Sequence, residues 1–117
     1  MSRVFVYGTL KSGFSAHQLL QAARFVDGQF ALNCALDDQG SFPGMVFEAG
    51  NRVWGEVYEV DDDTLQSLDH YEGVAHGLYR REEVELYDGS KALAYLFNRD
   101  HSGRPKVESG VWDELPG

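Results

Sequence analysis

The chain has 117 residues, of which 43% are hydrophobic and 25% charged, a composition that suits one globular domain with a buried core. Its 19 acidic residues outnumber 10 basic ones, and the net charge of −9 repels the phosphates of nucleic acids and anionic lipid surfaces. No apolar run approaches the roughly 20 residues that span a bilayer, and the first apolar stretch is too short for a signal peptide. We therefore expect a single domain over residues 1–117, in the cytoplasm, with neither nucleic-acid nor membrane partners.

The first half of the chain is predicted to consist mainly of strands. Alternation from Arg3 to Tyr7 predicts a buried strand with Val4 and Val6 on one face and Phe5 and Tyr7 on the other. Turn residues and apolar spacing then predict a loop over 8–14, a short helix over 15–24 capped by Ser15, a strand over 28–36, a loop over 37–44, and two strands over 45–50 and 52–60.

The second half begins with a helix and ends with a hairpin. The three aspartates 61–63 are good helix caps, and Gly73 is expected to end the helix. A strand over 79–87, a turn at Asp88-Gly89 and a return strand over 92–98 follow. We expect an α+β fold, with a curled, mainly antiparallel sheet or a small β-barrel flanked by two short helices.

A glycine-containing loop directly follows the first predicted strand. Gly8 and Gly13 flank Thr9, Leu10 and Lys11, and such a turn can present backbone N–H groups to an anion or a carbonyl oxygen. The alternative is a tight turn in which Gly8 supplies a positive φ while Thr9 and Lys11 are solvated. The loop lacks the Gly-Lys-Ser/Thr ending of phosphate-binding loops, so it does not predict nucleotide binding.

Glu72 is the second candidate for a functional residue. It follows Leu65 by seven residues and Leu68 by four, so it is expected on the apolar face of the predicted helix. Desolvation on that face and the negative end of the helix dipole would raise the pKa of Glu72 and make it a stronger base. The alternative places Glu72 at the rim of the protein, paired with Arg80 or Arg81.

The sequence shows no pattern typical of a metal site or of a serine or cysteine nucleophile. The four histidines and Cys34 share no metal-ligand spacing, and no serine lies in a G-x-S-x-G motif. Cys34 cannot form an internal disulfide and is expected to be a small buried side chain. We therefore expect no metal site.

Four sequence blocks occur in the order and spacing of a known family. They are VFVYGTLKSGFSAHQLL from Val4, FPGM at 42–45, VWGEVYEVD at 53–61, and LDHYEG with LYRREEVEL between 68 and 86. Together they span nearly the whole chain. The chain resembles the γ-glutamylcyclotransferase-like family, and within it the small γ-glutamylamine cyclotransferase-like branch with a YGTLK opening.

The resemblance implies a compact β-barrel flanked by helices and a reaction without cofactor or metal. The free α-amine of a γ-glutamyl group attacks its own γ-carbonyl, which releases an amine or amino acid and leaves 5-oxoproline. The resemblance further implies a small-molecule γ-glutamyl substrate and a catalytic role for Glu72 as general acid and base. Substrate contacts are implied for the residues that match YGTL and for one pocket tyrosine, namely Tyr7, Gly8, Thr9, Leu10 and Tyr95.

An alternative of another class stays open. The same pocket could belong to a non-catalytic module that senses a small metabolite or docks a partner, since a fold does not fix a function. The sequence predicts neither the leaving group nor the oligomeric state.

Overall fold

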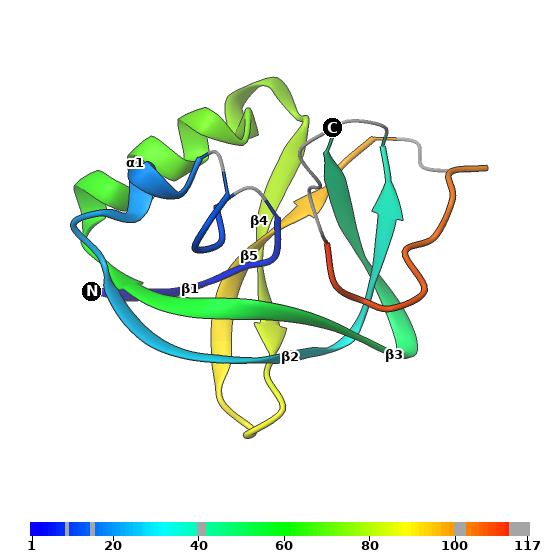
Figure 1. Ribbon diagram of the computed structural model, residues 1–117. Coiled ribbons are helices and arrows are strands. Elements are labelled where there is room, and N and C mark those ends of the chain that lie inside the picture. The colour runs from blue at the N-terminus through cyan, green and yellow to red at the C-terminus, as the bar shows by residue number, and fades with distance from the viewer. Residues whose placement is uncertain (9, 15, 40–41, 100–102, 113–117) are drawn as a thin grey trace.

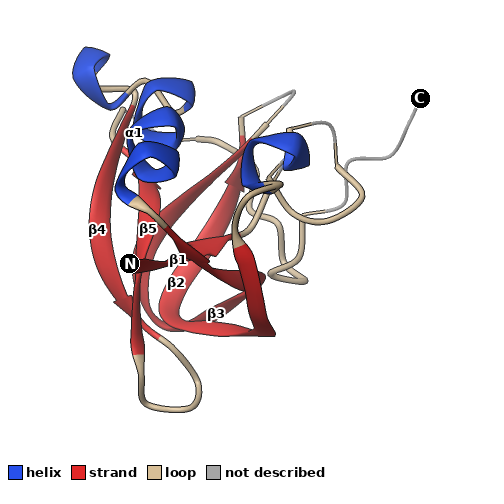
Figure 2. Cartoon of the chain, turned by 90° about the vertical axis from the view of Figure 1, so that its left-hand side faces the viewer, coloured by secondary structure: helices blue, strands red, loops and turns tan. Residues whose placement is uncertain are grey.

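The computed structural model describes the chain except at residues 9, 15, 40–41, 100–102 and 113–117 (Figure 1). In the described part the elements follow the order β1 (Ser2–Val6), η1 (His17–Leu20), β2 (Arg24–Asp38), β3 (Pro43–Val60), α1 (Asp62–Tyr71), η2 (Val74–His76), β4 (Tyr79–Glu85) and β5 (Lys91–Phe97). The helical segments lie together at one end of the sheet (Figure 2). None of the described helices is long and apolar enough to cross a membrane.

The five strands form one curled, mixed sheet in the order β2-β3-β1-β5-β4. The pairs β1–β3, β2–β3 and β4–β5 are antiparallel, whereas β5 runs parallel to β1 and also touches β3 in parallel. The α+β class and the mainly antiparallel sheet are confirmed. A closed barrel is wrong, because the two edges of the sheet meet at one isolated bridge, Ala31–Leu86, instead of forming a ladder in the described residues.

The longest element is the hairpin of β2 and β3, which differs from the prediction. Residues 45–50 and 52–60 form parts of one strand of 18 residues. The register shifts between Leu32 and Cys34, and at this shift the Gly50 N–H donates to Oδ1 of Asn33 over 3.1 Å. Gly50 and Asn33 both adopt a positive φ, so the glycine expected to separate two strands instead forms an irregularity within one strand.

Of the two predicted helices, the second is confirmed and the first is much shorter than expected. Asp61 caps α1 by accepting a hydrogen bond from the Thr64 N–H over 2.8 Å, and Gly73 follows its end with φ +67°, as expected. The helix expected over 15–24 is a four-residue 3₁₀ segment, η1. Its N-cap residue is Ala16, which has no side-chain cap, and β2 already begins at Arg24. The predicted cap, Ser15, lies outside the described residues.

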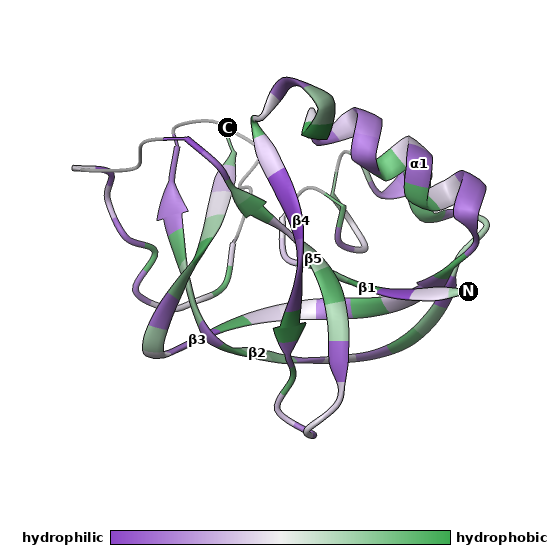
Figure 3. Ribbon diagram, turned by 180° about the vertical axis from the view of Figure 1, so that it is seen from behind, coloured by the Kyte–Doolittle hydropathy of each residue, from purple (hydrophilic) through white to green (hydrophobic). Residues whose placement is uncertain are grey.

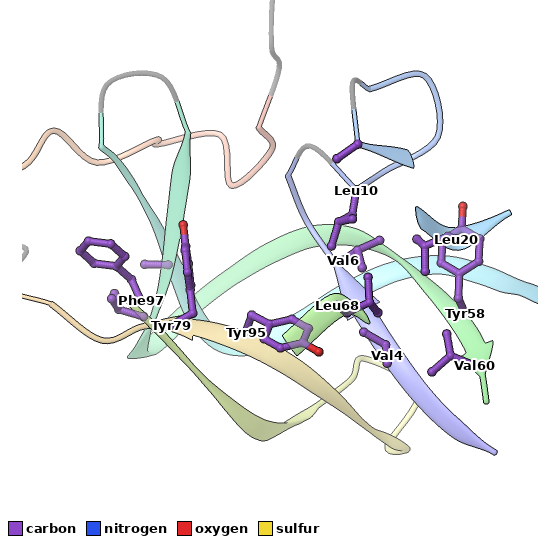
Figure 4. Close-up of a cluster of buried hydrophobic side chains, with 13 residues drawn as sticks. Val4, Val6, Leu10, Leu20, Tyr58, Val60, Leu68, Tyr79, Tyr95 and Phe97 are labelled. Carbon is purple, nitrogen blue, oxygen red and sulfur yellow. The ribbon is translucent and has the colours of Figure 1, made fainter. Parts of the chain in front are cut away.

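The apolar core occupies both faces of β1. Val4 and Val6 belong to one buried cluster, while Phe5 and Tyr7 belong to another, as the alternation predicts. Figure 4 shows the first cluster, where Leu68 of α1 packs beside β1. In Figure 3, α1 alternates between hydrophilic and hydrophobic residues, which is the pattern of a helix lying on a core. This packing fixes the carboxyl end of α1 beside the end of β1.

Candidate active site

A cavity of about 260 Å³ opens where β1, α1 and the start of β3 meet. Aromatic and aliphatic side chains form most of its wall, and Glu72 is the one acidic residue among the described residues that line it. The lining residues are Phe5, Val6, Tyr7, Gly8, Leu10, Phe42, Pro43, Tyr71, Glu72, Leu78, Tyr79 and Tyr95. The structure therefore brings together the described residues that the sequence singled out, whereas Thr9 lies outside the described residues.

Glu72 lies at the carboxyl end of α1. It is the C-cap residue, and its N–H donates to the Leu68 carbonyl over 2.9 Å. The side chain is half-buried in the cavity wall, and burial raises the pKa of Glu72 to about 7. The alternative, in which Glu72 lies at the rim and pairs with Arg80 or Arg81, is wrong: Glu72 lines the cavity, Arg81 pairs with Asp69, and Arg80 pairs with Glu82.

Two buried tyrosines form the wall next to Glu72. The Tyr7 hydroxyl donates to the Tyr95 carbonyl over 2.6 Å and accepts from the Met45 N–H over 3.2 Å. The Tyr79 hydroxyl donates to the Pro43 carbonyl over 2.6 Å. Burial, and to a lesser degree the nearby Glu72 carboxylate, raises the pKa of both phenols above their usual range. Both are therefore neutral groups that shape the cavity rather than exchange protons.

Gly8 lies at the turn where the chain leaves β1. Its φ is not positive, so the alternative interpretation, in which Gly8 supplies a positive φ, is wrong. The glycine is instead required by close packing, since a Cβ would lie 2.7 Å from Cγ of Pro43. The Gly8 carbonyl accepts from the Lys11 N–H over 3.0 Å, and among the described residues no protein acceptor is found for the N–H groups of Gly8 and Leu10. Both residues line the cavity, so an oxygen atom of a bound molecule is a candidate acceptor for these N–H groups.

The loop after Gly8 is held from several sides. His17 bonds through Nδ1 to the Leu10 carbonyl over 2.9 Å, and the Ser12 N–H donates to Glu56 over 2.7 Å. Lys11 is 5% exposed and donates through Nζ to the Trp112 carbonyl over 2.8 Å, so it is not the solvated lysine of the alternative interpretation. No local pattern predicts the contacts of this loop with Glu56 and Trp112, because both residues are remote from it along the chain.

Tyr95 lines the cavity, but its hydroxyl is already bonded to another side chain. The hydroxyl donates to Oδ1 of Asp69 on α1 over 2.7 Å, and Nη1 of Arg81 donates to Oδ2 of the same carboxylate over 2.6 Å. Sequence reasoning did not identify Asp69 or Tyr79. The one sequence feature that could have indicated Tyr79 is its position in the strand that follows the helix ended by Gly73.

No group of three or more potential metal ligands occurs among the described residues. Cys34 is fully buried, as expected, and burial raises the pKa of its thiol to about 11. The thiol is therefore a poor nucleophile near neutral pH. The arrangement as a whole offers one carboxylate of raised pKa, main-chain donors and a largely apolar wall.

Comparisons with known proteins point to one family. The family model described as gamma-glutamyl cyclotransferase, AIG2-like, matches residues 4–114. A Vibrio cholerae relative that carries the name "Putative gamma-glutamylcyclotransferase" is 42% identical over 111 residues, 93% of each chain. The gamma-L-glutamyl-butirosin B gamma-glutamyl cyclotransferase of Niallia circulans is 33% identical over 109 residues, 86% of this chain and 69% of that one. The crystal structure of an uncharacterized Pyrococcus horikoshii protein matches with a TM-score of 0.81 at 32% identity, covering 97% of this chain and 92% of that one.

Proposed function

Because the chain belongs to the AIG2-like γ-glutamyl cyclotransferase family, we propose that it converts a γ-glutamyl amine or γ-glutamyl amino acid to 5-oxoproline and the free amine. The observation that carries the proposal is a half-buried Glu72, with a pKa of about 7, in a cavity that Gly8 and Leu10 also line, two residues whose N–H groups have no protein acceptor among the described residues. A general base works best when its pKa lies near the operating pH. An ordinary exposed glutamate would be too weak a base for this task.

Glu72 acts on the proton of the attacking amine. The α-ammonium of the substrate gives a proton to the Glu72 carboxylate, and the freed nitrogen attacks the γ-carbonyl carbon to close a five-membered ring. The electron pair of the C=O bond moves to oxygen. The protonated Glu72 then gives its proton to the departing nitrogen as the carbonyl re-forms and the original amide C–N bond breaks. The ring nitrogen, which became positively charged on attack, gives its second proton to the Glu72 carboxylate, and Glu72 passes this proton to the released amine, which leaves as an ammonium ion. One carboxylate thus serves both steps and ends ionised.

The Gly8–Leu10 loop supplies donors for the oxygen atoms of the substrate. Negative charge develops on the γ-carbonyl oxygen in the tetrahedral intermediate, and fixed N–H groups stabilise such a charge without rearranging. The same loop can bind the substrate α-carboxylate through neutral donors. Because nucleophile and electrophile belong to one molecule, the remaining task of the cavity is to hold the substrate in a curled conformation.

The cavity favours a leaving group without a carboxylate. All ten lysines and arginines lie in the described part of the chain, and none of them lines the cavity. A second carboxylate, as in a γ-glutamyl amino acid, would face Glu72 and an apolar wall without a cation to pair with. We therefore expect γ-glutamyl amines to be the better substrates.

A panel of γ-glutamyl amines and γ-glutamyl amino acids tests the proposal. We expect the purified protein to release 5-oxoproline, measured by mass spectrometry, and Glu72→Gln to lower kcat/KM by at least about 100-fold because the base is lost. Glu83→Gln is the matched control, since Glu83 is exposed on β4 and remote from the cavity lining.

The non-catalytic alternative gives a different result in the same panel. A binding module would be stabilised against heat by a γ-glutamyl compound that it leaves chemically unchanged. Stabilisation without 5-oxoproline, or full activity of Glu72→Gln, would contradict the proposed reaction. The cytoplasmic location, the single domain and the absence of nucleic-acid and membrane partners stay predictions.

A further inference from the structure

Tyr95 connects the two halves of the candidate site. Its side-chain hydroxyl donates to Asp69 on α1 over 2.7 Å, and its backbone carbonyl accepts from the Tyr7 hydroxyl over 2.6 Å. Tyr7 directly precedes Gly8, the first residue of the donor loop. One residue of β5 is therefore bonded both to the helix that ends at Glu72 and to the loop that offers the N–H groups.

Arg81 completes the contact with α1. Arg81 and Tyr95 are direct cross-strand partners in the β4–β5 pair, so their side chains project from the same face of the sheet. Both reach the Asp69 carboxylate, one at each oxygen, with Nη1 of Arg81 2.6 Å from Oδ2. The carboxylate is thereby fixed in position and orientation, which a single hydrogen bond would not achieve.

The place of Asp69 on the helix makes this contact relevant to Glu72. Asp69 lies three residues before Glu72, hence nearly one turn away on a neighbouring side of α1. Leu68, which is fully buried, packs against the core, so apolar packing holds the helix axis. Rotation of the helix about its axis is resisted by the polar contact of Asp69 with the sheet.

We propose that Asp69 and Tyr95 are positioning residues of the cyclotransferase, and that their hydrogen bond fixes the Glu72 carboxylate relative to the Gly8–Leu10 donors. This inference rests on the proposed function. It reassigns Tyr95, which the family resemblance implies as a substrate-contacting tyrosine. Figure 4 shows Tyr95 in the same buried cluster as Leu68 of α1.

A double-mutant cycle separates positioning from substrate contact. Tyr95→Phe and Asp69→Ala each remove one partner of the same hydrogen bond, and each is expected to lower kcat/KM by roughly 10- to 100-fold through misplacement of Glu72. The double variant is expected to be no worse than the poorer single variant, because the bond is already lost. A substrate contact by the Tyr95 hydroxyl would instead give losses that multiply.

A second measurement does not depend on activity. Carbon-13 NMR titration of the Glu72 carboxyl group in the free protein is expected to give a lower pKa in both single variants, because a displaced side chain gains contact with water. A role in stability alone would lower Tm and leave the pKa of Glu72 unchanged. Arg80→Gln is the matched control: it removes the exposed Arg80–Glu82 pair on the same strand without touching α1, and it should leave both readouts unchanged.

The outcomes are distinguishable. The positioning role is overturned if the losses of kcat/KM in the two single variants multiply in the double variant. It is also overturned if the pKa of Glu72 equals the wild-type value in variants that unfold cooperatively. A wild-type protein that releases no 5-oxoproline refutes the proposed function, whereas the titration still decides whether Asp69 and Tyr95 hold Glu72. If Tyr95→Phe does not fold, Asp69→Ala still tests the positioning role, because Asp69 is partly exposed. The pKa of Glu72 and kcat/KM are then measured in Asp69→Ala alone.

Discussion

Single side chains carry the chemistry of this protein, and their properties come from what surrounds them. Glu72 is an ordinary glutamate whose pKa is raised from 4.5 to about 7 because the cavity wall removes much of its water. Gly8 has no side chain because Pro43 occupies the space that a Cβ would need. The phenols of Tyr7 and Tyr79 are fixed by backbone carbonyls, so the carboxylate is left as the group that can exchange a proton near neutral pH.

Because burial opposes its charge, Glu72 should destabilise the fold when ionised. The folded protein holds this proton more tightly than the unfolded chain, so wild-type stability is fully present below pH 4.5 and declines as the pH rises through 7. We expect Glu72→Gln to be more stable than wild type by about 1–3 kcal/mol at pH 8, allowing for residual solvent contact, and nearly equal to it at pH 4. Urea unfolding at both pH values measures the difference. A variant that is less stable at pH 8 would show that the carboxylate is not desolvated.

At the scale of elements, the end of α1 is what presents Glu72 to the cavity. The helix begins with the Asp61 cap and ends with Glu72 as its C-cap, after which Gly73 turns the chain with φ +67°. The Gly73 N–H bonds to the His70 carbonyl, and its own carbonyl accepts from the Leu78 N–H. A left-handed residue is therefore needed directly after the catalytic candidate.

Substitutions at Gly73 should separate backbone strain from chemistry. Gly73→Ala is expected to lower the free energy of unfolding by about 1–2 kcal/mol, because an alanine is strained at this φ. The added Cβ would also lie 3.3 Å from Cβ of Leu78. Gly73→Asn should cost less, since asparagine tolerates the left-handed region better than alanine. Chemical denaturation of the two variants compares them, and equal losses would indicate that the crowding at Leu78, not φ, limits this position.

At the scale of the whole molecule, acidic side chains outnumber basic ones, 19 to 10. The net charge is −9, and most of the cationic side chains are committed elsewhere: Arg24, Arg80, Arg81, Lys91 and Lys106 to ion pairs and Lys11 to a backbone carbonyl. The cavity receives no lysine or arginine from the chain. Discrimination between substrates should therefore depend on the charge of the leaving group.

Two substrates that differ in one carboxylate test whether the charge of the leaving group determines the rate. We expect γ-glutamyl-phenethylamine to be converted with a kcat/KM roughly tenfold or more above that of γ-glutamyl-phenylalanine, because the extra carboxylate is unpaired beside Glu72. Tyr71, 46% exposed at the cavity, offers a place to reverse the preference. Tyr71→Arg should narrow the difference, while Tyr71→Gln, the uncharged control, should not. Equal conversion of both substrates by wild type would mean that the leaving group does not enter the cavity.

Local sequence was sufficient for much of this structure. The alternation in β1 predicted which residues face each core cluster, the aspartates and Gly73 predicted both ends of α1, and Leu65 and Leu68 predicted the side from which Glu72 projects. These features depend on residues within a few positions of one another, so the periodicities of strand and helix express them directly. The four ordered sequence blocks predicted the family, which the comparisons confirm.

Only the tertiary structure decided how these pieces meet. The open, mixed sheet depends on β5 running parallel to β1, a pairing between segments far apart along the chain that no local pattern encodes. No local pattern encodes the packing of Gly8 on Pro43 or the hydrogen bond of Lys11 with the Trp112 carbonyl. The contact of Tyr95 and Arg81 with Asp69 likewise joins segments far apart along the chain. The sequence by itself determined which residues could do chemistry and on which faces they lie, because these depend on local geometry. Distances between them were left to the fold, because they result from long-range packing of the whole chain.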